Sequence, residues 1–267
     1  MFLSSQVLLC QVIGFAIWSW LNGRFWMMAL GMAASIGIPL IAHPYSEIRN
    51  ESAKYIYTHW SFVKHVLNSF LLSTCSWPSF DGTLTWWPRN ETLTSSQTWL
   101  EVVFVFILCQ WFVDYLAYLW ACTEYTPKDF LVMRWHHVVT VGLMFISFWL
   151  GYIPIGAEIL YLHEFTDIFM STLQMMKLQS SPYLVPVFLL NIVSWAYWRI
   201  FSFGSLIISL YHATPSPSYL TGLGEFSLLC LWLMHIYWLG LMLSIAVRLT
   251  TTPASKLSSD YDGRNKK

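Results

Sequence analysis

The chain has 267 residues, of which 56% are hydrophobic and only 10% are charged. Soluble domains carry about a quarter charged residues, so this composition excludes an ordinary soluble protein. The formal net charge is zero at pH 7, which leaves no basic surface for nucleic acid. The composition therefore predicts an all-α, multi-pass protein of the lipid bilayer.

Apolar runs of about 20 residues, the length of a membrane-spanning helix, recur along the chain. They predict a bundle of seven or eight spans, at 5–21, 25–42, 60–77, 99–122, 130–150, 153–176, 184–212 and 226–249. The first run lacks a basic leader and a clear cleavage site, so we interpret it as a retained anchor. The run 60–77 is polar enough to lie in the membrane interface instead, and 184–212 is long enough to tilt or bend.

Lysine and arginine in the loops predict the orientation. If both termini are cytosolic, the cytosolic connections hold Arg49, Lys54, Lys128, Lys177, Lys256, Arg264, Lys266 and Lys267. The opposite side then holds only Arg24 and Arg89. The tripeptide Asn90-Glu91-Thr92 lies in the longest non-cytosolic loop, so Asn90 is a glycosylation candidate, with a chance match as an equal alternative.

The spans divide the chain into three parts. Residues 1–59 are predicted to form a transmembrane hairpin and a cytosolic loop, residues 60–249 the main membrane domain, and residues 250–267 a disordered cytosolic tail. The five cysteines show no CxxC spacing, so we expect buried free thiols rather than disulfides or metal ligands.

Ionisable side chains inside the predicted spans are few, and such residues usually mark a functional site. They are Asp114, His136, His137, Glu158, His163, Glu164, Asp167, Arg199 and His235. A single histidine in a span most often makes a helix–helix hydrogen bond, which is the expectation for His65 and for His235. Arg199 is expected to pair with a carboxylate such as Asp114 or Glu158.

Two neighbouring runs concentrate these groups. In the run 130–150, His136 and Thr140 share one helix face, with His137 about 100° further round. The run 153–176 carries His163, Glu164 and Asp167, whose three- and four-residue spacings predict that they project from one side.

The connection between these two runs is Gly151 and Tyr152, which forces antiparallel packing and brings the imidazoles and carboxylates together. A carboxylate beside an imidazole fixes its tautomer and raises its basicity. Such a pair can remove a proton from a nucleophile, or attack an acyl group itself.

The segments KDFLVMRWHHVVT and LHEFTD together resemble the Lag1 motif of ceramide synthases, within the TRAM–Lag1–CLN8 (TLC) domain family. WAYWRIFSF and LMHIYWLGLML resemble two later helices of that family, and the similarity covers roughly residues 60–249. The resemblance implies about six helices around a central cavity, in the endoplasmic reticulum membrane. It also implies transfer of a fatty acyl group from acyl-CoA to a sphingoid base, with no metal and no cofactor beyond that co-substrate.

The resemblance also implies roles for single residues. His136 and His137 match the paired histidines, His163 the third histidine and Asp167 the second aspartate, while Glu164 replaces the first aspartate. These five are the expected catalytic residues. The expected substrate-binding residues are Thr140, Asp114, Arg199, His235, Arg134 and Lys128. For Lys128 and Arg134, contact with the CoA phosphates and the ordinary cytosolic excess of positive charge explain the residues equally well.

Three other functions stay open at this stage. The first is a non-catalytic TLC-domain protein in lipid sensing or cargo escort. The second is a di-iron membrane hydroxylase or desaturase, whose histidines are grouped in HxxxH or HxxHH motifs. In this chain His43, His59, His65 and His212 are scattered and form no such motif. The third is a transporter. The oligomeric state also stays open, with a homodimer as one candidate.

Overall fold

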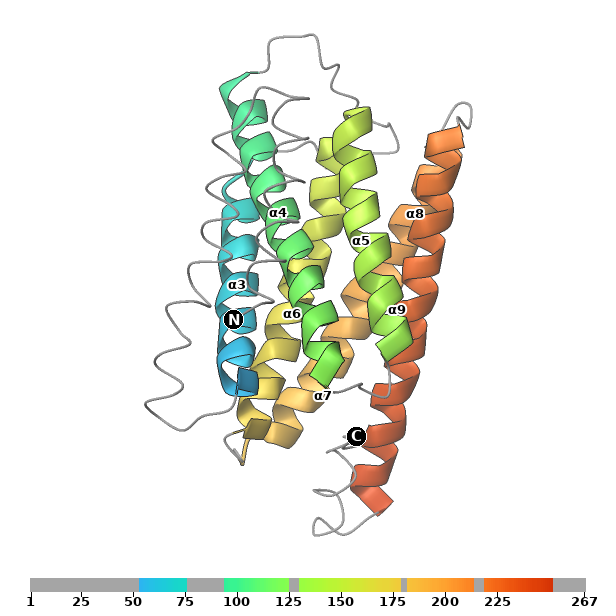
Figure 1. Cartoon of the computed structure of the whole chain (residues 1–267). Coiled ribbons are helices and arrows are strands. Elements are labelled where there is room, and N and C mark those ends of the chain that lie inside the picture. The colour runs from blue at the N-terminus through green and yellow to red at the C-terminus, as the bar shows by residue number, and fades with distance from the viewer. Residues whose placement is uncertain (1–52, 76–93, 125–129, 179–181, 214–218, 252–267) are drawn as a thin grey trace.

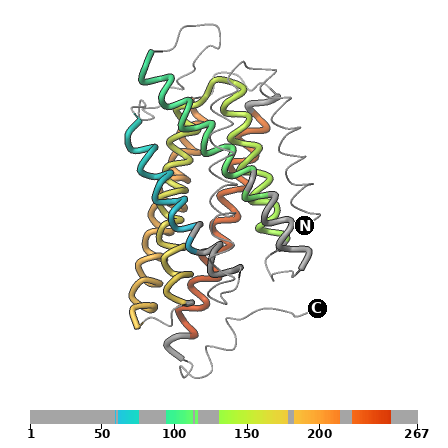
Figure 2. Tube along the Cα trace, turned by 60° about the vertical axis from the view of Figure 1, so that its left-hand side comes forward, coloured from blue at the N-terminus to red at the C-terminus, as the bar shows by residue number. Residues whose placement is uncertain are grey.

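A computed structural model describes residues 53–75, 94–124, 130–178, 182–213 and 219–251, and every element in these ranges is a helix. The helices pack side by side with roughly parallel axes, and successive helices run in opposite directions if residues 184–213 are taken as one continuous helix (Figures 1 and 2). The predicted spans 5–21 and 25–42, the tail 252–267, Asn90 and Lys128 lie outside the described residues.

The described helices correspond to the later six predicted spans. They are α3 Ala53–Ser73, α4 Ser95–Glu124, α5 Phe130–Leu150, α6 Ile153–Leu178, α7 Leu184–Trp195, the π-helix η1 Ala196–Ser202, α8 Phe203–Ala213 and α9 Tyr219–Thr251. The prediction for α5 matches at both ends. By contrast, α3 and α9 begin before the predicted runs, because a helical backbone continues past the apolar window that hydropathy detects.

Three described segments are long and apolar enough to cross a membrane: Leu131–Leu150, Leu184–Ala213 and Gly222–Arg248. Helix α3 is more polar, but it does not lie apart from the bundle, since it packs along α6 (Figure 1). Its Lys64, His65 and Asn68 are buried. Large apolar side chains such as Trp135, Phe201 and Phe226 are exposed on the outer surface, where lipid tails would cover them.

The segment Leu184–Ala213, whose length allowed a tilt or a bend, contains one π-helix in its middle. A π-helical turn is wider than an α-helical one, and such turns are frequent at functional sites. Here it carries the buried Arg199, and it contacts both α6 and α9.

The turn between α5 and α6 explains their antiparallel packing. Gly151 has φ 79°, a backbone conformation that favours glycine. The Gly151 N–H bonds to the carbonyl of Phe148 at 3.3 Å, and the Tyr152 N–H to that of Ser147 at 2.8 Å. This pattern is a Schellman helix end, and it confirms the predicted two-residue connection.

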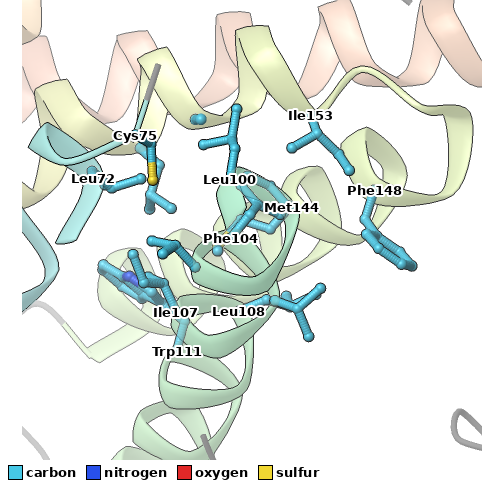
Figure 3. Close-up of a cluster of buried hydrophobic side chains, with 14 of the residues drawn as sticks. Leu72, Cys75, Leu100, Phe104, Ile107, Leu108, Trp111, Met144, Phe148 and Ile153 are labelled. Atoms are coloured by element: carbon cyan, nitrogen blue, oxygen red, sulfur yellow. The ribbon is translucent and has the colours of Figure 1, made fainter. Parts of the chain in front are cut away.

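Buried apolar side chains hold the helices on either side of the polar centre. One cluster joins α3, α4, α5 and α6 and includes Leu72, Leu100 and Phe104 (Figure 3). Another joins α5, α6, α8 and α9 around Phe203 and Leu231. Among the cysteines with described side chains, Cys75, Cys109 and Cys230 are free thiols, and the first two are buried, as expected.

Candidate active site

Four imidazoles converge in the centre of the bundle. His136 and His137 on α5 have ring centroids 5.7 Å apart, and His235 on α9 lies 6.1 Å from His136. His163 on α6 lies 4.9 Å from His235. All four are buried, with at most 5% of their surface exposed. We call this group the histidine chamber, and it unites the three predicted catalytic histidines with His235.

Aromatic side chains form the walls of the histidine chamber. The ring of Trp111 on α4 lies 5.9 Å from His136 and 5.8 Å from His137. The ring of Trp238 lies 5.2 Å from His136, edge to face. The imidazoles are therefore enclosed by low-polarity surface, in which polar interactions are stronger than in water.

The backbone fixes the tautomer of His163. Its Nδ1 lies 2.6 Å from the carbonyl oxygen of Ile159, one turn earlier on α6. A carbonyl oxygen only accepts hydrogen bonds, so Nδ1 carries the proton. In the neutral ring the other nitrogen, Nε2, then holds a lone pair, and it is buried without a hydrogen-bond partner among the described residues. His163 can therefore accept a proton or a hydrogen bond from a substrate.

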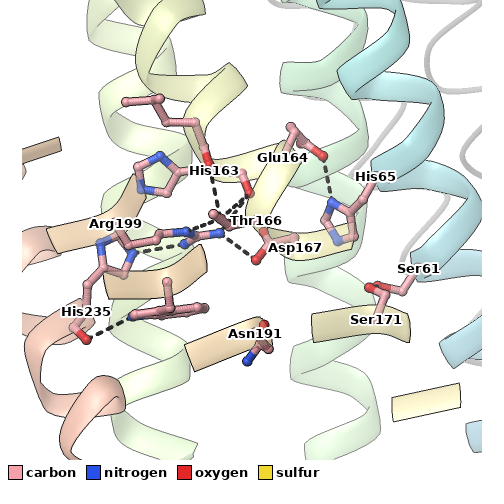
Figure 4. A network of polar contacts seen from close by, with 12 residues as sticks. Ser61, His65, His163, Glu164, Thr166, Asp167, Ser171, Asn191, Arg199 and His235 are labelled. Atoms are coloured by element: carbon pink, nitrogen blue, oxygen red, sulfur yellow. Dashed lines mark hydrogen bonds and ion pairs between the residues drawn. The ribbon is translucent and has the colours of Figure 1, made fainter. Parts of the chain in front are cut away.

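Arg199 connects α6, η1 and α9 through its guanidinium (Figure 4). It donates to Asp167 Oδ1 at 2.5 Å, to Thr166 Oγ1 at 2.6 Å and to the His163 carbonyl at 2.9 Å. Arg199 does pair with a carboxylate, as predicted, but its partner is Asp167 rather than Asp114 or Glu158. Asp167 consequently bonds to Arg199 rather than orienting one of the paired histidines.

Glu164 points away from the histidine chamber towards α3 and α4. Its Oε2 lies 2.6 Å from His65 Nδ1, and its Oε1 accepts from Trp111 Nε1 at 2.6 Å. The prediction that His163, Glu164 and Asp167 project from one side was therefore wrong for Glu164, which is rotated about 100° from His163. Trp111, which donates to Glu164, also contacts the rings of both paired histidines.

Asp114 is paired with Lys64 across α3 and α4. The Lys64 ammonium also lies 4.9 Å from the centroid of the Trp111 ring, within the range of a cation–π contact. His65 makes the helix–helix hydrogen bond expected of a single histidine, although its acceptor is a predicted catalytic residue.

An apolar cavity leads away from the histidine chamber. It is lined at one end by His163 and Thr140 and at the other by Leu150 and Tyr152. Gly224, Glu225 and Leu228 of α9 form part of its wall. Along α5 its lining runs from Thr140 to Leu150, which is ten steps of 1.5 Å or about 15 Å.

The remaining predicted site residues lie elsewhere. Arg134 is exposed near the start of α5, outside the histidine chamber. Sequence reasoning did not assign Lys64 or Trp111 to the site. Two spacings in the sequence could have indicated them. Lys64 and Asn68 are four residues apart, and Trp111 and Asp114 are three residues apart. No group of three or more histidine, cysteine or acidic side chains in the described part of the chain is placed to hold a metal ion.

Shortening Glu164 to aspartate tests its double contact. Glu164 is fully buried, and hydrogen bonds to a charged group are each worth about 1.5–3 kcal/mol. Aspartate is one methylene shorter and cannot reach both His65 and Trp111, so Glu164→Asp is expected to lower stability by about 2 kcal/mol. Thermal unfolding of the purified protein measures this loss. The matched Glu225→Asp should change stability by less than about 0.5 kcal/mol, and equal losses in the two variants would contradict the assignment.

The family model described as "TLC domain" matches residues 53–244, which include the whole histidine chamber. The chain belongs to the TLC domain family. This finding confirms the family that the paired histidines and the LHEFTD segment indicated.

Named relatives of this TLC domain protein include ceramide synthases. Ceramide synthase LOH2 of Arabidopsis thaliana is 34% identical over 61% of this chain and 56% of its own length. ASC1-like protein 3 of Oryza sativa subsp. japonica is 32% identical over 57% of this chain and 55% of its own length. Ceramide synthase 1 LOH3 of Arabidopsis thaliana is 25% identical, over 80% of this chain and 75% of its own length. The chain thus spans little more than half the length of the first two relatives.

Proposed function

We propose that this TLC domain protein is a ceramide synthase-like N-acyltransferase. It would transfer a fatty acyl group from acyl-CoA to the amine of a sphingoid base, giving a (dihydro)ceramide. The observation that carries the proposal is the buried histidine chamber, which leads into an apolar cavity through His163 and Thr140. Relatives named as ceramide synthases support it.

The chamber offers the groups that acyl transfer to an amine needs. The amine nitrogen attacks the thioester carbonyl carbon, a C–N bond forms, and the C–S bond breaks as CoA leaves as its thiol. In this direct route, His136 or His137 takes the proton from the amine. In the alternative route, an imidazole nitrogen of His136 or His137 first attacks the thioester, and the C–S bond breaks to give an acyl-imidazole and the CoA thiol. The amine then attacks the acyl-imidazole, the new C–N bond forms, and the bond to the imidazole breaks and restores the histidine. The reaction needs no group beyond the two substrates and these side chains.

The apolar cavity is the proposed site of the fatty acyl chain. Its wall is almost entirely hydrophobic, so it would bind a hydrocarbon chain through burial of apolar surface. The polar end at His163 and Thr140 would then lie beside the thioester, with the chain extending towards Leu150 and Tyr152.

Gly224→Leu is expected to shift the preference of the enzyme towards shorter acyl chains. Gly224 lines the cavity, and a Cβ there would meet only Ile146 Cγ2, at 4.0 Å, so a larger side chain can enter without displacing the helices. Overpacking a filled site costs about 1–3 kcal/mol. The rate with the longest acyl-CoA that the wild type uses should therefore fall about tenfold or more relative to a short one. Competition assays with mixed acyl-CoAs measure this ratio.

Gly240→Leu is the matched control for that experiment. Gly240 lies on the same helix, a Cβ there meets nothing within 4 Å, and the residue does not line the cavity. Its substitution should leave the chain-length preference unchanged. A Gly224→Leu enzyme with the wild-type preference would show that the acyl chain binds elsewhere.

The wider arrangement of the protein is part of the proposal. It comprises seven or eight spans, with about six helices around the cavity and both termini in the cytosol. The endoplasmic reticulum is the proposed membrane, and residues 1–59, 60–249 and 250–267 are the proposed hairpin, TLC domain and tail. Acyl-CoA and the sphingoid base are the proposed partners, with no further cofactor, and a homodimer is a candidate assembly.

A non-catalytic role in lipid sensing, membrane homeostasis or cargo escort is the second candidate. One observation favours it: Glu164 and Asp167 bond to His65 and Arg199, so the two motif carboxylates do not bond to the paired histidines. In that case the histidine chamber would bind a lipid without converting it.

Expression in cells that lack their own ceramide synthases distinguishes the two functions. The transferase predicts that cells supplied with sphinganine accumulate dihydroceramide, which lipid mass spectrometry detects. Cells carrying an empty vector provide the baseline. Well-expressed protein in the correct membrane with dihydroceramide at that baseline would contradict the transferase and favour the non-catalytic role.

A further inference from the structure

Arg199 determines which nitrogen of His235 carries a proton. Its Nη1 lies 3.0 Å from His235 Nε2, and both side chains are buried (Figure 4). A guanidinium has donors only, so His235 Nε2 must be the acceptor. The proton of the neutral imidazole is therefore on Nδ1.

The position of Arg199 leaves it little freedom to release His235. Its Nε and Nη2 are bonded to Thr166, Asp167 and the His163 carbonyl, and its face stacks on Trp195 at 4.6 Å. The backbone carbonyl of His235 accepts from Trp195 Nε1 at 3.1 Å. Both partners of the Arg199–His235 bond are thus held from several directions.

His235 Nδ1 has no hydrogen-bond partner within the described ranges, although the side chain is fully buried. A buried N–H without an acceptor is costly, and in native proteins each such group needs an explanation. The two ring nitrogens of imidazole lie on opposite sides, so Nδ1 points away from Arg199. The rings of His163 and His136 lie 4.9 Å and 6.1 Å away.

Between His235 and His163, whose rings are 4.9 Å apart, the histidine chamber consequently presents an unused donor and an unused acceptor close together. The donor is His235 Nδ1–H, and the acceptor is the Nε2 lone pair of His163. A group that carries both an acceptor oxygen and an N–H, such as a carbonyl under attack by an amine, matches this pair.

We propose that His235 is a catalytic hydrogen-bond donor to the thioester carbonyl oxygen, and that Arg199 is the positioning residue that holds it in the Nδ1–H tautomer. This inference rests on the proposed acyl transfer. When the amine nitrogen attacks, the C=O π electrons move to oxygen, and the oxyanion accepts a hydrogen bond from His235 without taking its proton. The carbonyl then re-forms, the C–S bond breaks, and the proton lost by the amine goes to the departing sulfur.

Two variants of His235 separate this role from a purely structural one. In His235→Gln, the amide oxygen can accept from Arg199 while the amide N–H still donates, so kcat should stay within about tenfold of the wild type. His235→Leu removes the donor, and loss of one oxyanion donor lowers kcat by about 10²–10³-fold. The KM for acyl-CoA should change little in either. Equal activity of the leucine variant and the wild type, or equal loss in both variants, would overturn the donor role.

The tautomer can be measured without turnover, by ¹⁵N NMR of histidine-labelled wild-type protein in lipid nanodiscs. The His235 signals are identified by their absence in His235→Gln. A proton on Nδ1 alone is the expected result, and a proton on Nε2 overturns the donor assignment even if the enzyme is active. Absence of acyl transfer by the wild type, with Nδ1 protonated, removes the proposed function instead, and the catalytic role of His235 with it.

Discussion

Replacing His136 and His137 together by alanine is expected to lower the rate of amide formation by about 10²–10⁴-fold, the usual contribution of a positioned acid–base group. Both rings are buried in the histidine chamber against Trp111, and α5 carries no other histidine that could take their place. The measurement is the rate of dihydroceramide formation from labelled acyl-CoA and sphinganine, with purified wild-type and variant protein at equal concentration.

His212→Ala is the matched control for the histidine pair. His212 lies at the end of α8, is exposed, and contacts Tyr211 rather than the chamber. Its removal should leave the rate unchanged. If the double variant keeps the wild-type rate, the catalytic assignment of the paired histidines is wrong.

Arg199→Met is expected to lower the stability of the bundle by about 3 kcal/mol. Breaking a buried ion pair by removing one partner costs about 3–5 kcal/mol, because the other charge is left uncompensated. The side chain of Asp167 is 16% exposed, which places the loss at the lower end of that range. Thermal unfolding in detergent measures it. Activity should fall as well, since both His235 and the His163 backbone lose a contact.

Two further variants test the reason for that loss. Asp167→Asn added to Arg199→Met removes the uncompensated charge, so the double variant should be more stable than Arg199→Met alone. Arg134→Met removes an exposed arginine and should change stability by less than about 0.5 kcal/mol. A double variant less stable than Arg199→Met would show that the ion pair is not the source of the loss.

The sequence alone predicted those helices and turns that adjacent residues determine. The apolar run 130–150 ends at a glycine, and Gly151 ends α5 with a positive φ, so this helix and its antiparallel partner followed from the residues themselves. The convergence of His136, His137 and His163 followed from the same short turn. No local feature of the sequence, however, determines how far a helix backbone continues beyond its apolar part, and the starts of α3 and α9 were predicted too late.

The partners of the buried charges could not be predicted, because they depend on how distant helices are rotated against each other. Arg199 and Asp167 are 32 residues apart, and the π-helix that carries Arg199 leaves no clear pattern in the sequence. His65 and Glu164 are 99 residues apart. A spacing of three or four residues predicts a shared helix face. Glu164 and Asp167 are three residues apart, yet they bond to residues of two different helices, His65 and Arg199.

Purified protein reconstituted in liposomes with sphinganine and labelled acyl-CoA gives the most direct test of acyl transfer in the histidine chamber. We expect repeated turnover, with one dihydroceramide formed for each CoA thiol released. Saturable binding of acyl-CoA or sphinganine without release of CoA would contradict it, and would identify the chamber as a lipid-binding site alone.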